Sequence, residues 1–188
     1  MKINDTATAR GVGLFGCTAG SAMISDLTIK NAAVSAKAGS GVAAVVGMAL
    51  QTNDAAIKNV VLVGDNTISG ISMVGGIIGG GYCGVESCTA SADIVLLSVL
   101  SGAGNSAGIL AGGMSDMGTG CSIVSCDVTG GAISVGDGSG GGVSVVGGLA
   151  GCATDYSAVK NCSVKNVTIT VPKGSVMIGG LVGASGKI

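Results

Sequence analysis

Seven cysteines are the residues of this 188-residue chain with the clearest chemical potential. Four of them form two C-x4-C pairs in matching register, Cys83 with Cys88 and Cys121 with Cys126. Four thiolates could bind a zinc ion, although structural zinc sites usually use the tighter C-x2-C spacing. The same cysteines could instead form disulfides within or between the pairs, and the odd total would leave one thiol over.

A third interpretation places three cysteines in the core. Cys88, Cys126 and Cys162 share the fourth position of a six-residue motif that occurs five times, and Leu27 and Val60 fill that position in the other two copies. A position shared with Leu and Val is apolar, and a free cysteine behaves there as a small buried hydrophobe. We therefore expect a buried ladder of unreactive thiols, with no metal site, no cofactor site and no catalytic residue.

Other candidate chemistry is sparse. The chain has no histidine, which removes the usual general base and the commonest metal ligand. The glycine-rich tract 136–142 lacks the lysine of a phosphate-binding loop, so it predicts a turn or small insertion. Turn-like contexts make calcium conceivable at four aspartates, without the clustered spacing of a calcium loop: Asp65, Asp116, Asp137 and Asp155. Tyr82 and Tyr156 follow similar motifs and could form a binding patch or simply pack within loops.

Composition excludes several classes of protein. Glycine supplies 37 residues, 47% of residues are hydrophobic and only 10% are charged, which is the opposite of a disordered chain. Nine basic residues and three aromatic ones make a poor nucleic-acid surface. No apolar run is long enough for a membrane-spanning helix, and the first ten residues lack the apolar core of a signal peptide. Residues 59–159 contain seven acidic residues and no basic residue, so the middle of the chain is acidic and both ends are basic.

Internal repeats determine the predicted architecture. A four-residue motif that closes with glycine recurs six times, at Gly16, Gly47, Gly79, Gly112, Gly151 and Gly183. Its second position is always a large aliphatic residue, which we assign to one core column: Leu14, Val45, Ile77, Leu110, Leu149 and Leu181. The six-residue motif follows the first five copies, with apolar residues at positions one, four and six and a short polar residue at position three. A segment rich in β-branched residues closes each unit.

Three short β segments per unit, separated by glycine and small polar residues, are typical of one coil of a parallel β-solenoid. We predict an all-β fold, a right-handed parallel β-helix with three short strands per coil and five to six coils. Residues 1–10 would form an N-terminal cap segment, and residues 11–188 a single solenoid of five full repeats plus a partial sixth. Residues 63–76 and 135–148 align without a gap, which suggests that they are equivalent.

The units resemble GLUG repeats, named for a Gly-Leu-hydrophobic-Gly core. Gly180-Leu181-Val182-Gly183 and Gly148-Leu149-Ala150-Gly151 match best, and residues 159–164 are similar to the second conserved stretch of that family. The resemblance runs from Gly11 to Gly183, and Ala44 and Ile109 depart from its leading glycine. It implies a segment of a bacterial surface or secreted protein, and it supplies no catalytic residues.

We expect a non-catalytic structural or adhesive segment, a spacer or interaction surface, located outside the cell or on its surface. A pectate-lyase type of enzyme is disfavoured because the acidic middle lacks basic partners. The alternative function is a self-assembling filament, because open coils expose unpaired strand edges. We expect no nucleic-acid partner and no membrane span. Self-association is expected through the C-terminal edge around Val176–Val182, and the sequence does not identify a host or matrix ligand.

Overall fold

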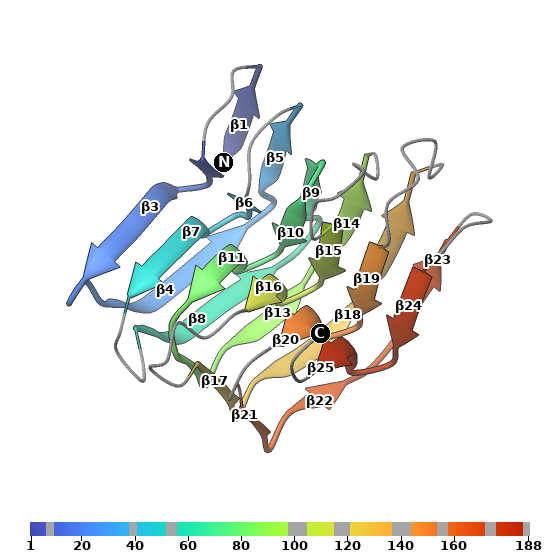
Figure 1. The fold of residues 1–188 in the computed structure, drawn as a ribbon. Helices are drawn as coiled ribbons and strands as arrows, with labels where there is room; N and C mark the ends of the chain where they lie inside the picture. Colours follow the sequence, from blue (N-terminus) through green and yellow to red (C-terminus); the bar gives the residue numbers. More distant parts are fainter. Residues whose placement is uncertain are drawn as a thin grey trace.

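A computed structural model describes residues 1–6, 10–37, 41–51, 56–97, 105–114, 121–136, 144–153, 158–171 and 176–185. These residues form 25 strands and no helix, and the strands pair in parallel from one coil to the next (Figure 1). The strands build three sheets, one of 13 strands and two of six. The prediction of an all-β parallel β-helix is therefore confirmed.

The 13-stranded sheet, here called the outer sheet, has two arms that meet at a corner. Strand β18 (Asp127–Val135) runs through the corner and belongs to both arms. The first arm also contains β1 (Lys2–Asp5), β5 (Ala33–Ala36), β9 (Thr67–Gly70), β14 (Asp93–Leu96) and β23 (Val167–Thr170). The second arm contains β4 (Ile24–Lys30), β8 (Ile57–Val63), β12 (Val85–Glu86), β13 (Thr89–Ser91), β17 (Ser122–Val124), β21 (Ala158–Lys160) and β22 (Ser163–Val164).

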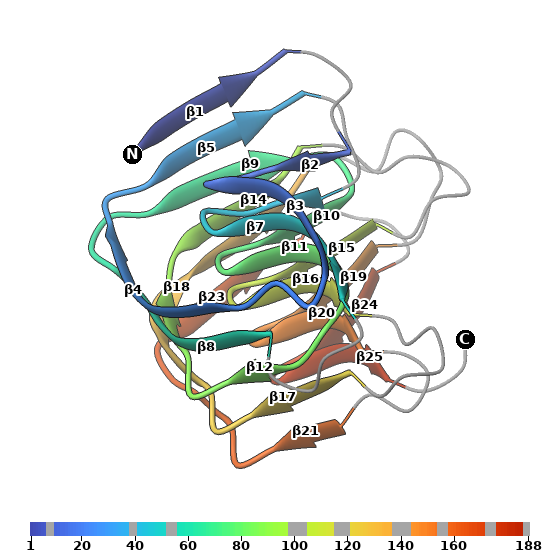
Figure 2. The ribbon, with the colours of Figure 1, turned by 90° about the vertical axis from the view of Figure 1, so that its left-hand side faces the viewer.

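Two six-stranded inner sheets lie between the arms of the outer sheet (Figure 2). Inner sheet 1 contains β2 (Gly11–Val12), β6 (Gly41–Val42), β10 (Met73–Gly75), β15 (Asn105–Gly108), β19 (Ser144–Gly147) and β24 (Val176–Gly179). Inner sheet 2 contains β3 (Phe15–Gly20), β7 (Val46–Gln51), β11 (Ile78–Tyr82), β16 (Ala111–Met114), β20 (Ala150–Ala153) and β25 (Val182–Ser185). A full coil therefore passes through three sheets, in line with the three segments predicted per unit, and its segment in the outer sheet bends so that it pairs in both arms.

The glycine motif forms the tight turn that joins the two inner sheets. The turn points toward the corner of the outer sheet (Figure 2), where a side chain added at Gly76 would meet the side chain of Leu62. Its closing glycine lies against the backbone of the opposite inner strand: a β-carbon on Gly112 would stand 2.5 Å from the amide nitrogen of Val74. The same contact recurs at Gly151, 2.6 Å from the nitrogen of Ala107. The glycines are needed because the two sheets touch through their backbones.

The backbone conformation explains why the third position of the six-residue motif is always a short polar residue. Asp26, Asn59, Ser87, Ser125 and Asn161 all have φ between 52° and 55°, in the left-handed region. Asn and Asp are enriched in that conformation because their side chains can hydrogen-bond locally. Positions one and four are three residues apart and would face opposite sides of a regular strand, but the left-handed residue between them lets both face inward, which accounts for their apolar side chains.

Two sequence-based assignments look different in the structure. The predicted cap segment includes β1, which pairs in parallel with β5 as the first strand of the outer sheet. The gapless match of residues 63–76 with 135–148 holds only in inner sheet 1. There Met73 of β10 pairs with Ser106 of β15, and Ser106 pairs with Val145 of β19, as the match requires. In the outer sheet Ile68 aligns with Ile94 and Ile133, so Val63 and Val135 are not equivalent.

Candidate functional site

The column of large aliphatic residues lies at the tip of each inner turn. Backbone hydrogen bonds join the tips from coil to coil: Ile77 N–H donates to Leu110 O (2.9 Å), and Leu149 N–H donates to Leu181 O (2.9 Å). Val45, Ile77, Leu110 and Leu149 are completely buried. These four residues form the centre of the core, inside the corner of the outer sheet.

The two ends of the column depart from the expectation of burial. Leu14 is 45% exposed and Leu181 is 39% exposed, although both occupy the same place in their coils as the buried members. The first and last described coils have a neighbour on one side only, so half of the packing surface around each tip is open. Cys162 shows the same effect, since it is half-buried while Cys88 and Cys126 are completely buried.

The three cysteines of the six-residue motif form a ladder in which sulfur is a hydrogen-bond partner. The backbone N–H of Val60 donates to Cys88 Sγ (3.4 Å), and the N–H of Cys88 donates to Cys126 Sγ (3.4 Å). Each thiol also lies near the carbonyl oxygen two residues before it, at 3.2 Å for Cys88, 3.3 Å for Cys126 and 3.1 Å for Cys162. The left-handed residue turns the following N–H away from its normal β partner, and the sulfur of the next coil accepts it.

This acceptor role is what sequence reasoning missed. The column shared with Leu27 and Val60 indicated an apolar position, and burial fits that interpretation. The signal for the second role was the run of three cysteines in consecutive coils, directly after a residue suited to a left-handed turn.

Two buried thiols, Cys83 and Cys126, resist the ionisation that metal binding requires, whereas the pKa of the Cys88 thiol is lowered, chiefly by its hydrogen bond with Cys126. Burial and, to a lesser extent, the nearby Cys121 together raise the pKa of the Cys83 thiol to about 12. The pKa of Cys126 is also raised, first because its thiol hydrogen-bonds to that of Cys88 and second because it is buried. Metal ligation needs thiolates. Among the described residues no three His, Cys, Asp or Glu side chains are grouped to hold a metal ion.

A pocket of about 250 Å³ opens at the corner of the outer sheet, and its origin is a mismatch in coil length. Three residues separate Ile29 from Ala33 at the first corner, and four separate their partners Leu62 and Thr67. Only two residues separate the next partners, Ala90 and Asp93. A long corner therefore lies beside a short one, and the recess forms between them.

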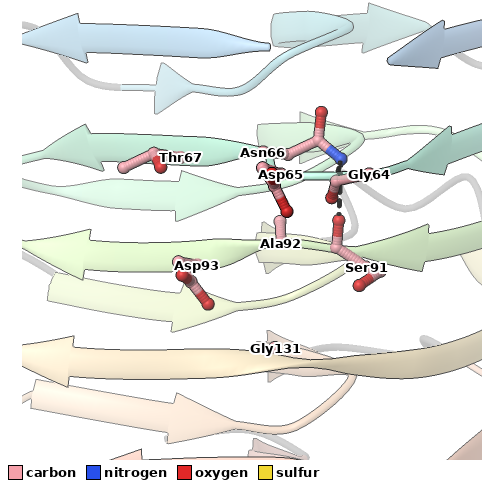
Figure 3. A pocket seen from close by; sticks show the side chains of 8 residues that line it. All are labelled: Gly64, Asp65, Asn66, Thr67, Ser91, Ala92, Asp93 and Gly131. Carbon is pink, nitrogen blue, oxygen red and sulfur yellow. Dashed lines mark hydrogen bonds between the residues drawn. The ribbon is translucent and has the colours of Figure 1, made fainter. Parts of the chain in front are cut away.

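Side-chain hydrogen bonds take the place of backbone hydrogen bonds between the coils at this mismatch (Figure 3). Asn66 is only 2% exposed; its Oδ1 accepts the N–H of Ala32 (2.8 Å), and its Nδ2 donates to Gly64 O (3.1 Å) and Ser91 O (2.9 Å). Asp93 Oδ1 accepts the N–H of Ala132 (3.0 Å). The side chains of Asn66 and Asp93 thus join coils of unequal length.

The remaining chemistry of the pocket is limited. Asp65 is exposed, as is Asp93, and the pocket wall adds the hydroxyl groups of Thr67 and Ser91. The lining contains no lysine, arginine or cysteine. The described pocket thus presents two exposed carboxylates and two hydroxyl groups, without a basic side chain in its lining.

Of the other predicted candidates, Tyr82 ends β11 and is half-buried. Asp116, Asp137, Asp155 and Tyr156 lie outside the described residues, as does most of the glycine-rich tract. No helix among the described residues is long and apolar enough to cross a membrane.

The fold and its glycine turns define a repeat protein of the parallel β-helix class. The family model of the GLUG motif matches residues 142–170, a segment that contains β19 to β23. The chain is therefore a GLUG-containing repeat protein, as its units suggest. No curated protein and no solved structure matches the chain.

Proposed function

We propose that the chain is a non-catalytic structural segment of a bacterial surface or secreted protein, acting as a spacer or adhesive stalk. The observation that carries this proposal is the tip column, which is completely buried in the four middle coils and joined by coil-to-coil hydrogen bonds. Such a core makes a stiff rod whose stability comes from contacts between neighbouring coils. Asn66 and Asp93 of the described pocket serve the same end, because their side chains hydrogen-bond from one coil to the next.

Surface labelling tests the location. Antibodies raised against the purified chain should label intact cells of the source bacterium, or its culture medium, without permeabilisation. A signal that appears only after permeabilisation would overturn the proposal. Binding of the purified chain to arrays of matrix proteins and glycans then separates an adhesive role from a pure spacer.

Self-assembly into filaments is the second candidate function, and the exposed end strands favour it. Large exposed hydrophobic side chains concentrate at the two terminal coils, with Leu14 and Phe15 at one end and Ile178 and Leu181 at the other. Unpaired strand edges beside such side chains are templates for association. We expect the C-terminal edge around Val176–Val182 to mediate weak association that salt promotes, because both ends are basic.

Negative-stain microscopy and sedimentation at low and high salt separate the two roles. Separate rods support the spacer, and long fibres support the filament. Ile178→Lys should weaken any association through the C-terminal edge. Leu97→Lys is a matched control, because Leu97 is also exposed but belongs to a middle coil. Equal association of the two variants would contradict an edge-mediated contact.

A further inference from the structure

Two buried thiols stand outside the hydrogen-bonded ladder. Cys83 lies two residues before Val85 of β12, and Cys121 lies two residues before Ile123 of β17. Val85 and Ile123 pair in parallel register. Both cysteines are 2% exposed. They therefore occupy the same place in the third and fourth coils, where the chain leaves inner sheet 2 for the outer sheet.

Their spacing suits a covalent link. Adjacent strands lie about 4.8 Å apart, and disulfides join residues whose Cα atoms are about 4.4–6.8 Å apart. The two thiols are near enough for Cys121 to raise the pKa of Cys83. The matching C-x4-C registers place both residues at equal distances from the ladder.

The ladder thiols accept backbone hydrogen bonds from the neighbouring coil. Cys126 Sγ accepts the N–H of Cys88, and Cys88 Sγ accepts the N–H of Val60. A disulfide between Cys88 and Cys126 would pull both sulfurs out of these positions and leave buried N–H groups without an acceptor, which is costly.

We propose that Cys83 and Cys121 form a disulfide that links the third coil to the fourth when a thiol–disulfide oxidant is present. With glutathione disulfide as oxidant, one cysteine thiolate attacks it, its S–S bond breaks, and one glutathione leaves. The second cysteine thiolate attacks the protein sulfur of the mixed disulfide and releases the second glutathione. Two protein thiols are oxidised, glutathione disulfide is reduced to two glutathiones, and the two protons pass to the departing thiolates.

Formation of this link in the cell rests on the proposed extracellular location, because disulfides persist in oxidising compartments. The pairing itself does not depend on that location. Since both thiols are buried, exchange takes place as the coils assemble, and the link closes a loop that spans one whole coil.

The test refolds the purified chain in glutathione buffers of reducing and of oxidising poise, followed by alkylation in denaturant and peptide mapping without reduction. We expect the oxidised protein to retain five of its seven thiols and to yield one linked peptide pair, Cys83 with Cys121. Its melting temperature should rise by about 10 °C relative to the reduced form, the effect of closing a long loop in a chain of this size. Seven free thiols at the oxidising poise, or a different linked pair, would overturn the proposal.

Variants sharpen the assignment. Cys83→Ser and Cys121→Ser should each abolish the thermal shift, and Cys17→Ser should keep it because Cys17 is exposed at the first coil. If either buried variant fails to fold, the peptide map of the unmodified chain still decides. The surface-labelling experiment is independent, so failure of the disulfide and failure of the proposed location can be told apart.

Discussion

The middle and terminal coils contain the same motifs but do not have the same core. Leu149 and Leu14 occupy equivalent turn tips, and the first is completely buried while the second is nearly half exposed. The closing glycines differ in the same way: an added β-carbon on Gly112 meets backbone atoms of two strands, whereas the nearest atom to one on Gly16 is the oxygen of Gly11 at 3.2 Å.

This contrast shows where the stability of the fold resides. A coil does not bury its own tip; it buries the tip of the coil beside it, as expected when repeats are stabilised by contacts with their nearest neighbours. Identical substitutions should therefore have unequal effects along the rod, and the inequality tests the assignment of columns.

The largest difference is expected for a charge at the tip. Leu149→Asp should cost more than about 4 kcal/mol, because it buries an unpaired carboxylate and removes a large apolar side chain. Leu14→Asp should cost less than about 1 kcal/mol, since water reaches that position. Urea denaturation of both variants measures the two values. Equal losses would show that the tips do not form one stacked column.

The closing glycines should give the second largest difference. Gly112→Ala would place its β-carbon 2.5 Å from Val74 N and 2.8 Å from the carbonyl carbon of Met73, so the inner sheets must separate. We expect a loss of about 3 kcal/mol, at the upper end of overpacking effects. Gly16→Ala needs a shift of only a few tenths of an ångström and should change stability by less than about 1 kcal/mol. Thermal unfolding of the pair checks this, and a stable Gly112→Ala would mean that the inner sheets are not in backbone contact.

The sequence was informative where periodicity alone decides the structure. The six tips, the short polar residue and the parallel strands all follow from columns that recur at each coil. The tight turn between the inner sheets was harder to predict from the sequence, because glycine also occurs in ordinary loops. Only the positions of Gly112 and Gly151 against opposite strands show that these glycines are needed for close approach.

The pocket at the corner could not be predicted for a different reason. It arises because the corner that ends in Thr67 is longer, and the corner that ends in Asp93 shorter, than the first. Such a difference appears only after both flanking strands have been aligned. The apparent match of residues 63–76 with 135–148 concealed it, since that match is correct only within inner sheet 1.

A smaller difference is expected along the thiol ladder. Cys126→Val keeps an apolar residue that the column accepts at Val60, but it leaves the buried N–H of Cys88 without its sulfur acceptor. The expected loss is about 1–3 kcal/mol. Cys162→Val should cost less than about 1 kcal/mol, because that position is only half-buried and water can replace the sulfur. Chemical denaturation under reducing conditions compares them. If both variants were neutral, the ladder would be an apolar column and nothing more.

The smallest effect should be a pH dependence confined to the first coils. Asp26 is exposed, and its carboxylate accepts a hydrogen bond from Asn59 Nδ2 at 3.0 Å. That bond, with a further one from Ser25, lowers the pKa of Asp26 in the folded state. A lowered pKa stabilises the fold above the unfolded value of about 3.9, and this contribution disappears as the pH falls through the lower folded value.

Hydrogen exchange of the β4 and β8 amides, measured at pH 5 and below pH 3.9, should reveal a slight loss of protection at the lower pH. Asp26→Asn should remove this local dependence, because an asparagine tolerates the left-handed backbone and does not titrate there. The middle coils provide the control, since serine occupies the equivalent positions 87 and 125. Equal loss of protection in the middle coils, or an unchanged profile in Asp26→Asn, would show that the pH dependence has another source.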